Sequence, residues 1–296
     1  IVFGDWSSDV CSSDLGSGVP SVERESMERL GSVMDSLDEL ETRALWALCR
    51  GSRYRDLELP IMVVNPHGHA VTDCVEFAGE VDARLAGVIG SRGLTFTAEA
   101  EDGSPVDVQA IHAEANIVRK GETRFRAALR VSVGAMSVRM VRLIAKATGS
   151  IPPAAAPVAA VGPQARRTVL ENSMLSVAVD AITGRIVSIR LKEGDRELLS
   201  GPARFLVMAD GNGAWGDGQT AWREVVGEFM QEASRRPAWS ERGSVFDEVQ
   251  VRLGYSRSVI QLSIRLYHAE PVVELLVRAV YNEPFTRLKL AVPTVL

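Results

Sequence analysis

Residues 258–267 read Ser258-Val-Ile-Gln-Leu-Ser-Ile-Arg-Leu-Tyr267, and this stretch decides the fold class. Isoleucine or leucine occupies every second position from 260 to 266, whereas the positions between them carry Gln261, Ser263 and Arg265. Alternation with a period of two is the pattern of a β-strand that turns one face toward an apolar core. Segments with the same rhythm recur on both sides, and turn residues such as Thr183-Gly184 separate them. The sequence therefore predicts a mainly β protein.

The chain divides into four segments after its first fifteen residues. Residues 16–59 contain an amphipathic helix at Val22–Cys49, where apolar residues recur in steps of three and four. Short strands predict a small antiparallel β domain at 60–146, and a linker rich in proline and alanine follows at 147–167. Residues 168–296 are predicted to form a large β-sandwich that is truncated at its C-terminal end, because its last strand would leave a sheet edge without a partner.

The first fifteen residues read unlike the rest of the chain. Asp5–Leu15 is DWSSDVCSSDL, which is the unbroken in-frame translation of a common sequencing-library adapter. The alternative is a natural tail rich in serine and aspartate that matches by chance. We interpret residues 1–15 as an artefact, and we expect the remaining chain to be a piece of a longer protein.

Composition argues against several functional classes. The 296 residues are 46% hydrophobic and 24% charged, as in an ordinary globular protein. The net charge of −5 lacks the basic excess that phosphate contacts require, so nucleic acid is not expected as a partner. No apolar run approaches the length of about 20 residues that spans a membrane, so no membrane partner is expected. The three cysteines suggest no disulfide framework, which favours a cytoplasmic location.

Few residues have the spacing of a catalytic or metal site. His67 and His69 flank a glycine and could reach one ion, but a zinc site usually has a third protein ligand, so an ordinary histidine turn is the favoured reading. Cys74 is predicted to be a buried structural thiol. The sequence contains no phosphate-binding glycine loop, nucleophile elbow or H-E-x-x-H motif. We therefore assign no catalytic residue and no metal ligand in this chain.

One glycine-rich loop could bind a sugar. The stretch from Asp210 to Gly218 places Trp215 between two carboxylates, those of Asp210 and Asp217. An aromatic face together with carboxylates that accept from hydroxyl groups suits a carbohydrate, and functional residues favour loops on a rigid scaffold. The alternative is an ordinary hairpin loop whose Trp215 packs on the core. We predict Asp210, Trp215 and Asp217 as substrate-binding residues.

Several strings, taken in order, resemble the C-terminal half of glycoside hydrolase family 38, the α-mannosidases. The strings that carry the resemblance are Met62–Pro66, Val131–Arg139, Val169–Leu175 with Asp180–Ile189, Arg257–Tyr267, and Val280–Glu283 with Leu288–Pro293. Two positions depart from the family pattern. Tyr281 stands where the family usually has tryptophan before Asn-Glu, and His67 follows Asn65-Pro66 in place of leucine.

The resemblance implies an architecture and a mechanism. The architecture is a β/α barrel, a three-helix bundle, a small β domain and a large sandwich of the galactose-mutarotase-like type. The barrel would hold the nucleophile, the acid and a divalent metal ion, usually zinc, of a retaining α-mannosidase. This chain would then begin with the last helix of the bundle, lack the barrel, and be inactive by itself. Its partner would be a mannoside substrate, and its oligomeric state is left open.

Two other interpretations remain open. The chain could be a self-standing, non-catalytic β-sandwich that binds carbohydrate or a protein. It could also belong to another sugar-processing enzyme, since several glycosidase classes share this architecture. The helix at Val22–Cys49 discriminates between the mannosidase and the self-standing sandwich, because a remnant of a bundle would carry an apolar stripe that this chain cannot cover.

Overall fold

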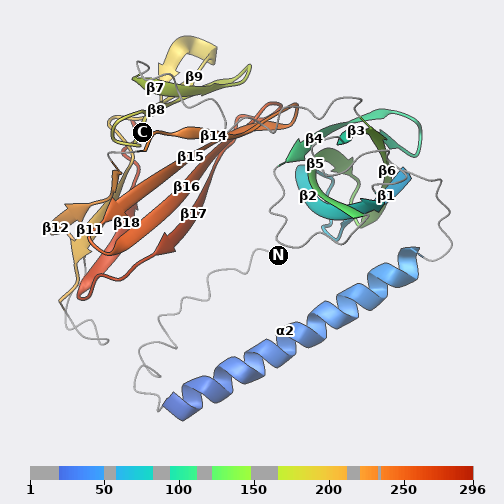
Figure 1. Cartoon of the computed structure of the whole chain (residues 1–296), viewed down its shortest axis with the longest axis horizontal. Coiled ribbons are helices and arrows are strands. Elements are labelled where there is room, and N and C mark those ends of the chain that lie inside the picture. Colours follow the sequence, from blue (N-terminus) through green and yellow to red (C-terminus); the bar gives the residue numbers. More distant parts are fainter. Residues whose placement is uncertain are drawn as a thin grey trace. The chain divides into compact units, whose positions relative to one another are not determined.

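A computed structural model of the chain shows a mainly β protein with one α-helix among the residues that it describes (Figure 1). The predicted fold class is thereby confirmed. The structure describes residues 20–49, 58–82, 94–111, 122–147, 166–211, 221–232 and 235–295. The chain forms two compact units, the first comprising residues 1–53 with 209–224 and the second residues 54–208 with 225–296. Residues 1–15 and most of the predicted linker lie outside the described residues.

Helix α2 extends over Pro20–Cys49 and confirms the helix that the apolar periodicity predicts. Two ion pairs, each between residues one turn apart, lie on its surface as Glu25–Arg29 and Glu39–Arg43. Its large apolar side chains are exposed, and they are Met27, Leu30, Val33, Met34, Leu37, Leu40, Trp46 and Leu48. No helix in the described ranges has both the length and the apolar character needed to cross a membrane.

The first six strands form one antiparallel sheet with the order β1-β6-β3-β4-β5-β2. Figure 1 shows these strands curled around a common centre. Their bounds are β1 Glu58–Asn65, β2 Val71–Asp82, β3 Leu94–Ala100, β4 Pro105–Ile111, β5 Glu122–Val133 and β6 Ser137–Ala147. Alternate residues of β5 and β6 fill the centre, where Phe125, Leu129 and Leu143 are almost completely buried. This core lets the small sheet pack on its own apolar side chains.

A buried asparagine fixes the turn that joins β1 to β2. The Asn65 side-chain amide donates to the backbone carbonyls of His69, Val133 and Gly134, at 2.8, 3.2 and 2.8 Å. Its side-chain oxygen accepts from the backbone N–H of His67 at 3.0 Å. The polar groups of Asn65 are therefore satisfied inside the protein, and the turn is held against the end of β5.

The remaining strands form a sandwich of antiparallel sheets. One sheet has the order β10-β9-β8-β7, one has β12-β11-β18, and one has β13-β15-β16-β17 with β14 also paired to β15. The bounds are β7 Arg167–Glu171, β8 Leu175–Asp180, β9 Ile186–Leu191, β10 Arg196–Glu197, β11 Arg204–Ala209, β12 Val225–Glu228, β13 Met230–Gln231, β14 Ala238–Arg242, β15 Phe246–Tyr255, β16 Ser258–Tyr267, β17 Val273–Val280 and β18 Thr286–Ala291. A 3₁₀ turn, η2, covers Glu193–Asp195.

From Ser263 to Leu266, strand β16 is buried on both of its faces. One face lies in the sandwich core through Ile260, Leu262, Ile264 and Leu266. These alternate with the polar face that begins at Gln261, as the sequence predicts. Ser263 and Arg265 on that polar face are also buried, and Arg265 is only 8% exposed. A charged side chain in such a position needs partners of opposite charge, and these are described below.

A tight turn joins β8 to β9 and confirms the hairpin that Thr183-Gly184 predicts. The Asp180 carboxylate accepts from the backbone N–H groups of Ile182 and Thr183 and from the Thr183 hydroxyl. Gly184 has φ +71°, in the left-handed region that glycine favours. A Cβ atom there would lie 2.6 Å from Val251 Cγ1 and 2.8 Å from Leu253 Cδ2. The turn therefore needs glycine for two independent reasons.

Replacing Gly184 with alanine should destabilise the sandwich by about 3 kcal/mol, because backbone strain adds to overpacking against β15. Gly103→Ala is the matched control, since Gly103 also has a positive φ of +79° but open space around its Cβ position. We expect the control to cost about 1 kcal/mol. Urea unfolding of both variants measures the difference, and equal losses would show that the contact with β15 contributes nothing.

Candidate functional site

The predicted substrate loop follows β11, and the structure describes its two ends. Asp210 is half-buried, and its carboxylate accepts a hydrogen bond from Trp222 Nε1 at 2.9 Å. The backbone N–H of Ala209 donates to the carbonyl of Glu224 at 2.9 Å. Asp210 therefore helps to close the base of the loop. Trp215 and Asp217 lie outside the described residues, so their roles stay predictions.

The two histidines of the β1–β2 turn face each other as stacked rings. Their centroids are 5.4 Å apart, and both side chains are exposed. Across the described residues, no group of three or more histidine, cysteine or acidic side chains is placed to hold a metal ion. The described residues thus do not fit a zinc site.

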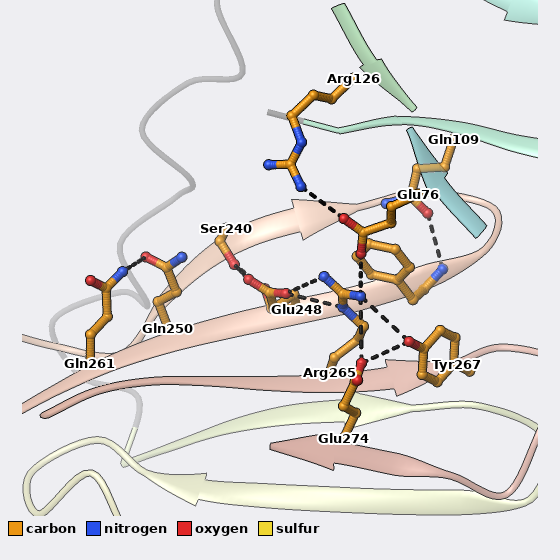
Figure 2. A network of polar contacts seen from close by, with 11 residues as sticks. Glu76, Gln109, Arg126, Ser240, Glu248, Gln250, Gln261, Arg265, Tyr267 and Glu274 are labelled. Carbon is orange, nitrogen blue, oxygen red and sulfur yellow. Dashed lines mark hydrogen bonds and ion pairs between the residues drawn. The ribbon is translucent and has the colours of Figure 1, made fainter. Parts of the chain in front are cut away.

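A cluster of charged side chains surrounds Arg265 (Figure 2). The antiparallel register places Glu248 of β15 and Glu274 of β17 on either side of Arg265. Arg265 donates to Glu248 Oε2 from Nε at 3.1 Å and from a terminal nitrogen at 2.9 Å. Its other terminal nitrogen lies 3.5 Å from Glu274 Oε2. The carboxylates of the two outer strands therefore both interact with the guanidinium group of the strand between them.

The six-stranded sheet supplies a third carboxylate to this cluster. Glu76 of β2 accepts from Arg265 at 2.5 Å, although 189 positions separate the two residues in the sequence. The other oxygen of Glu76 accepts from Arg126 of β5 at 2.8 Å. Ser240 of β14 donates to the second oxygen of Glu248 at 2.7 Å. The cluster thus contains two guanidinium groups and three carboxylates, and it links β2 and β5 to the sandwich.

Aromatic rings complete the environment of Arg265. Its guanidinium carbon lies 3.9 Å from the centroid of the Phe246 ring, a cation–π contact. Tyr267 accepts from Arg265 at 3.4 Å and donates to Glu274 at 2.7 Å. Burial, together with the hydrogen bond to Glu274, raises the pKa of Tyr267. Burial opposes the charge on Arg265, but the bond to Tyr267 and the nearby Glu76 raise the pKa of its guanidinium overall.

A second contact between the two β regions lies beside this cluster. The buried Gln109 of β4 accepts from the backbone N–H groups of Val245 and Phe246, at 3.0 Å each. A Cβ atom on Gly243 would lie 2.2 Å from Gln109 Cδ, so only glycine lets the chain approach so closely. Ile111, Ala128, Val245 and Phe246 form a small buried core there, with Cys74 and Tyr267 packed against it.

The cluster is suited to holding structure rather than to acid–base chemistry. A glycosidase acid must carry a proton and reach the bond that it cleaves. Glu76 and Glu248 instead accept hydrogen bonds from guanidinium groups, and Glu248 is among the buried residues. Polar groups in such a buried network favour one arrangement of the strands because an alternative would leave charges unpaired.

Sequence reasoning missed this cluster, although part of its signal was present. The hairpin of β15 and β16 sets Glu248 opposite Arg265 once the turn is placed, so this pair could have been found. Glu76 could not, because no local pattern connects positions 189 residues apart. Cys74 is half-buried against the small core, as expected for a structural thiol.

Comparisons with known proteins place part of this chain in a family context. Residues 170–295 match the model of the glycosyl hydrolases family 38 C-terminal domain. The match begins at the end of β7 and continues through β18, so it covers nearly all of the sandwich. It confirms the resemblance for the strings within residues 170–295, whereas Met62–Pro66 and Val131–Arg139 lie outside the matched residues. No curated protein matches the chain.

Replacing Arg265 with methionine should destabilise the protein by about 3–5 kcal/mol, because it leaves buried carboxylates without a counter-charge. The double variant Arg265→Met with Glu248→Gln should recover part of this loss. Arg142→Met is the control, since Arg142 pairs with Glu99 and Glu58 on the surface, where solvent screens the charges, and it should lose much less stability. Urea unfolding monitored by circular dichroism compares the three. Equal losses for Arg265→Met and Arg142→Met would contradict the assignment.

Burial and the nearby charge of Glu76 raise the pKa of Cys74 from 9.0 to about 12. A raised pKa in the folded state means that the neutral thiol is favoured by folding, so its contribution is complete below pH 9 and is lost as the pH rises toward 12. Cys74→Ala should therefore lose less stability than the unmodified chain between about pH 8 and about pH 10.5. Unfolding midpoints at both pH values test this, and an identical alkaline loss in both proteins would contradict it.

Proposed function

We propose that this chain is a non-catalytic C-terminal part of a retaining, metal-dependent α-mannosidase that hydrolyses mannosides or mannose-containing oligosaccharides. The observation that carries this proposal is the family 38 match over residues 170–295, which coincides with the sandwich. In the proposed enzyme, the nucleophile, the acid and the metal ligands belong to a catalytic barrel outside this chain.

The apolar periodicity of α2 is in keeping with a helix taken from a bundle. Met27, Leu30, Met34 and Leu37 recur at helical spacing, and each is more than half exposed. Apolar residues at this spacing form a stripe through which a helix packs against neighbouring helices, as in a bundle.

The role proposed for this chain is to support and shape the substrate site. A divalent metal ion, zinc by resemblance, would be held by the barrel, and none of the described residues is assigned to it. The sandwich would instead present the loop that begins at Asp210 at the rim of the active site. There Asp210, Trp215 and Asp217 would contact sugar hydroxyls and a ring face.

The alternative is a carbohydrate-binding module with no catalytic partner. The observation that favours it is that each of the two β regions has a buried apolar core of its own. Such a module would bind a glycan through its loops and would need no barrel.

The expected result of an assay on the purified chain is no hydrolysis of an aryl α-D-mannopyranoside, with or without added zinc, because the chain has no assigned nucleophile. A complete α-mannosidase assayed in the same buffer controls for the substrate. Turnover by the purified chain that is lost on exchange of its own acidic residues would contradict the proposal.

Reading the source DNA upstream of the codon for Gly16 separates the enzyme from the module. The enzyme predicts several hundred codons that encode a barrel with aspartate and histidine metal ligands. A start codon and ribosome-binding site directly upstream would instead establish the module.

A further inference from the structure

Two loops at one end of the sandwich border an open surface hollow that none of the above accounts for. The turn between β15 and β16 supplies Arg257, and the loop between β17 and β18 supplies Tyr281, Asn282, Glu283 and Pro284. The hollow measures about 550 Å³ and opens to solvent, with polar and apolar atoms in its wall. It lies between loops rather than in the core, and loops are where binding residues are most often found.

Hydrogen bonds tie the two loops together. The Glu283 carboxylate accepts from the backbone N–H of Arg257 at 3.0 Å and from the Ser258 hydroxyl at 2.8 Å. The Ser258 oxygen accepts in turn from the backbone N–H of Asn282 at 2.8 Å. Thr286 donates to the Glu283 carbonyl at 2.9 Å. The walls of the hollow are therefore fixed before any ligand arrives, which lowers the entropy that binding would lose.

The backbone is strained on both sides of the hollow. Ser256 has φ +47° and Phe285 has φ +55°, in the left-handed region that bulky residues avoid. Phe285 directly follows Pro284, and its side chain is 80% exposed. Packing cannot account for this residue, because its ring faces water, and glycine would fit the backbone better. Phe285 adjoins the hollow next to Pro284, and backbone strain of this kind clusters at binding sites.

Two polar side chains at the hollow have unused hydrogen-bonding capacity. In the described part of the chain, the Asn282 side-chain amide forms no hydrogen bond. The Arg257 guanidinium forms no direct hydrogen bond or salt bridge, although it is close enough to Glu283 for the two charges to interact. Arg257 can only donate, whereas Asn282 can donate and accept. A sugar hydroxyl also does both, so the pair is suited to neighbouring hydroxyl groups.

We propose that this hollow is a carbohydrate-binding site, in which the Phe285 ring stacks on the C–H face of a pyranose unit while Arg257 and Asn282 hydrogen-bond its hydroxyl groups. The choice of a glycan as ligand rests on the proposed function, and it places a binding site on loops other than the one that begins at Asp210. A pyranose has an apolar face and a polar rim, which matches an exposed ring beside two polar side chains with capacity to spare.

The test is calorimetric titration of the full chain with a linear α-linked mannotriose. Phe285→Gly should weaken binding about tenfold, because the stacking surface is lost. The melting temperature should not fall, because glycine relieves the strain at φ +55°. Asn282→Ala should also weaken binding. The matched control is Met136→Ala, since Met136 is another apolar residue with positive φ (+46°) and 73% exposure, and it lies in the β5–β6 turn.

Binding that is lost in Phe285→Gly and retained in Met136→Ala supports the site. Equal affinity in Phe285→Gly and the unmodified chain would overturn it, as would the absence of any binding by the unmodified chain. A self-association seen by sedimentation that disappears only in Phe285→Gly, without a glycan effect, would reassign the loop to a protein contact and also overturn the proposal. Titration with maltotriose separates the glycan site from the proposed mannosidase function. If maltotriose binds as tightly as mannotriose and its binding depends on Phe285, the glycan site is supported, but mannose is not its preferred sugar.

Discussion

The buried charge of Arg265 is the constraint on which the arrangement of the second compact unit depends. Strand β16 has a core on one face, so its other face could not remain in water once β2 packs near it. Burying a guanidinium is strongly unfavourable unless carboxylates compensate for it. Glu248 and Glu274 come from the adjacent strands of the same sheet, and Glu76 comes from the small β domain. Because all three share one cation, the register of β15, β16 and β17 and the docking of β2 are specified together.

Two buried asparagine side chains also fix the local structure, through hydrogen bonds instead of charges. Asn65 satisfies the turn after β1 with four hydrogen bonds, and Asn172 does the same after β7. Asn172 donates to the carbonyls of Tyr267 and Glu270, and so it ties the start of the sandwich to the end of β16. Both residues belong to strings that resemble family 38. The structure explains the residue type at these two positions, because a side-chain amide has two N–H donors and a carbonyl acceptor, and both residues use all of them at one buried point.

Local patterns predicted the elements whose burial follows a simple period. The alternation in β16, the helical spacing in α2 and the turn at Gly184 are confirmed, because each depends on residues close together in the sequence. The short strands β10, β12, β13 and β14 were missed, since two to five residues are too few for a period to show. The contact of Glu76 with Arg265 was out of reach for a different reason. It depends on the tertiary fold rather than on any local pattern.

The same distinction explains why site prediction lagged behind fold prediction. Apolar residues of the core recur at every second position of a strand, so their places can be predicted. The loop sequences that begin at Asp210 and Tyr281 have no such period, so it gives no prediction for their residues. Phe285 shows what this freedom permits. The bonds of Glu283 to the β15–β16 turn hold its loop so firmly that a bulky residue persists in a conformation that it would avoid elsewhere. A rigid sandwich can thus hold a residue in a strained conformation. Such a residue breaks the local rules for a stable fold, which is expected where a position serves a function rather than folding.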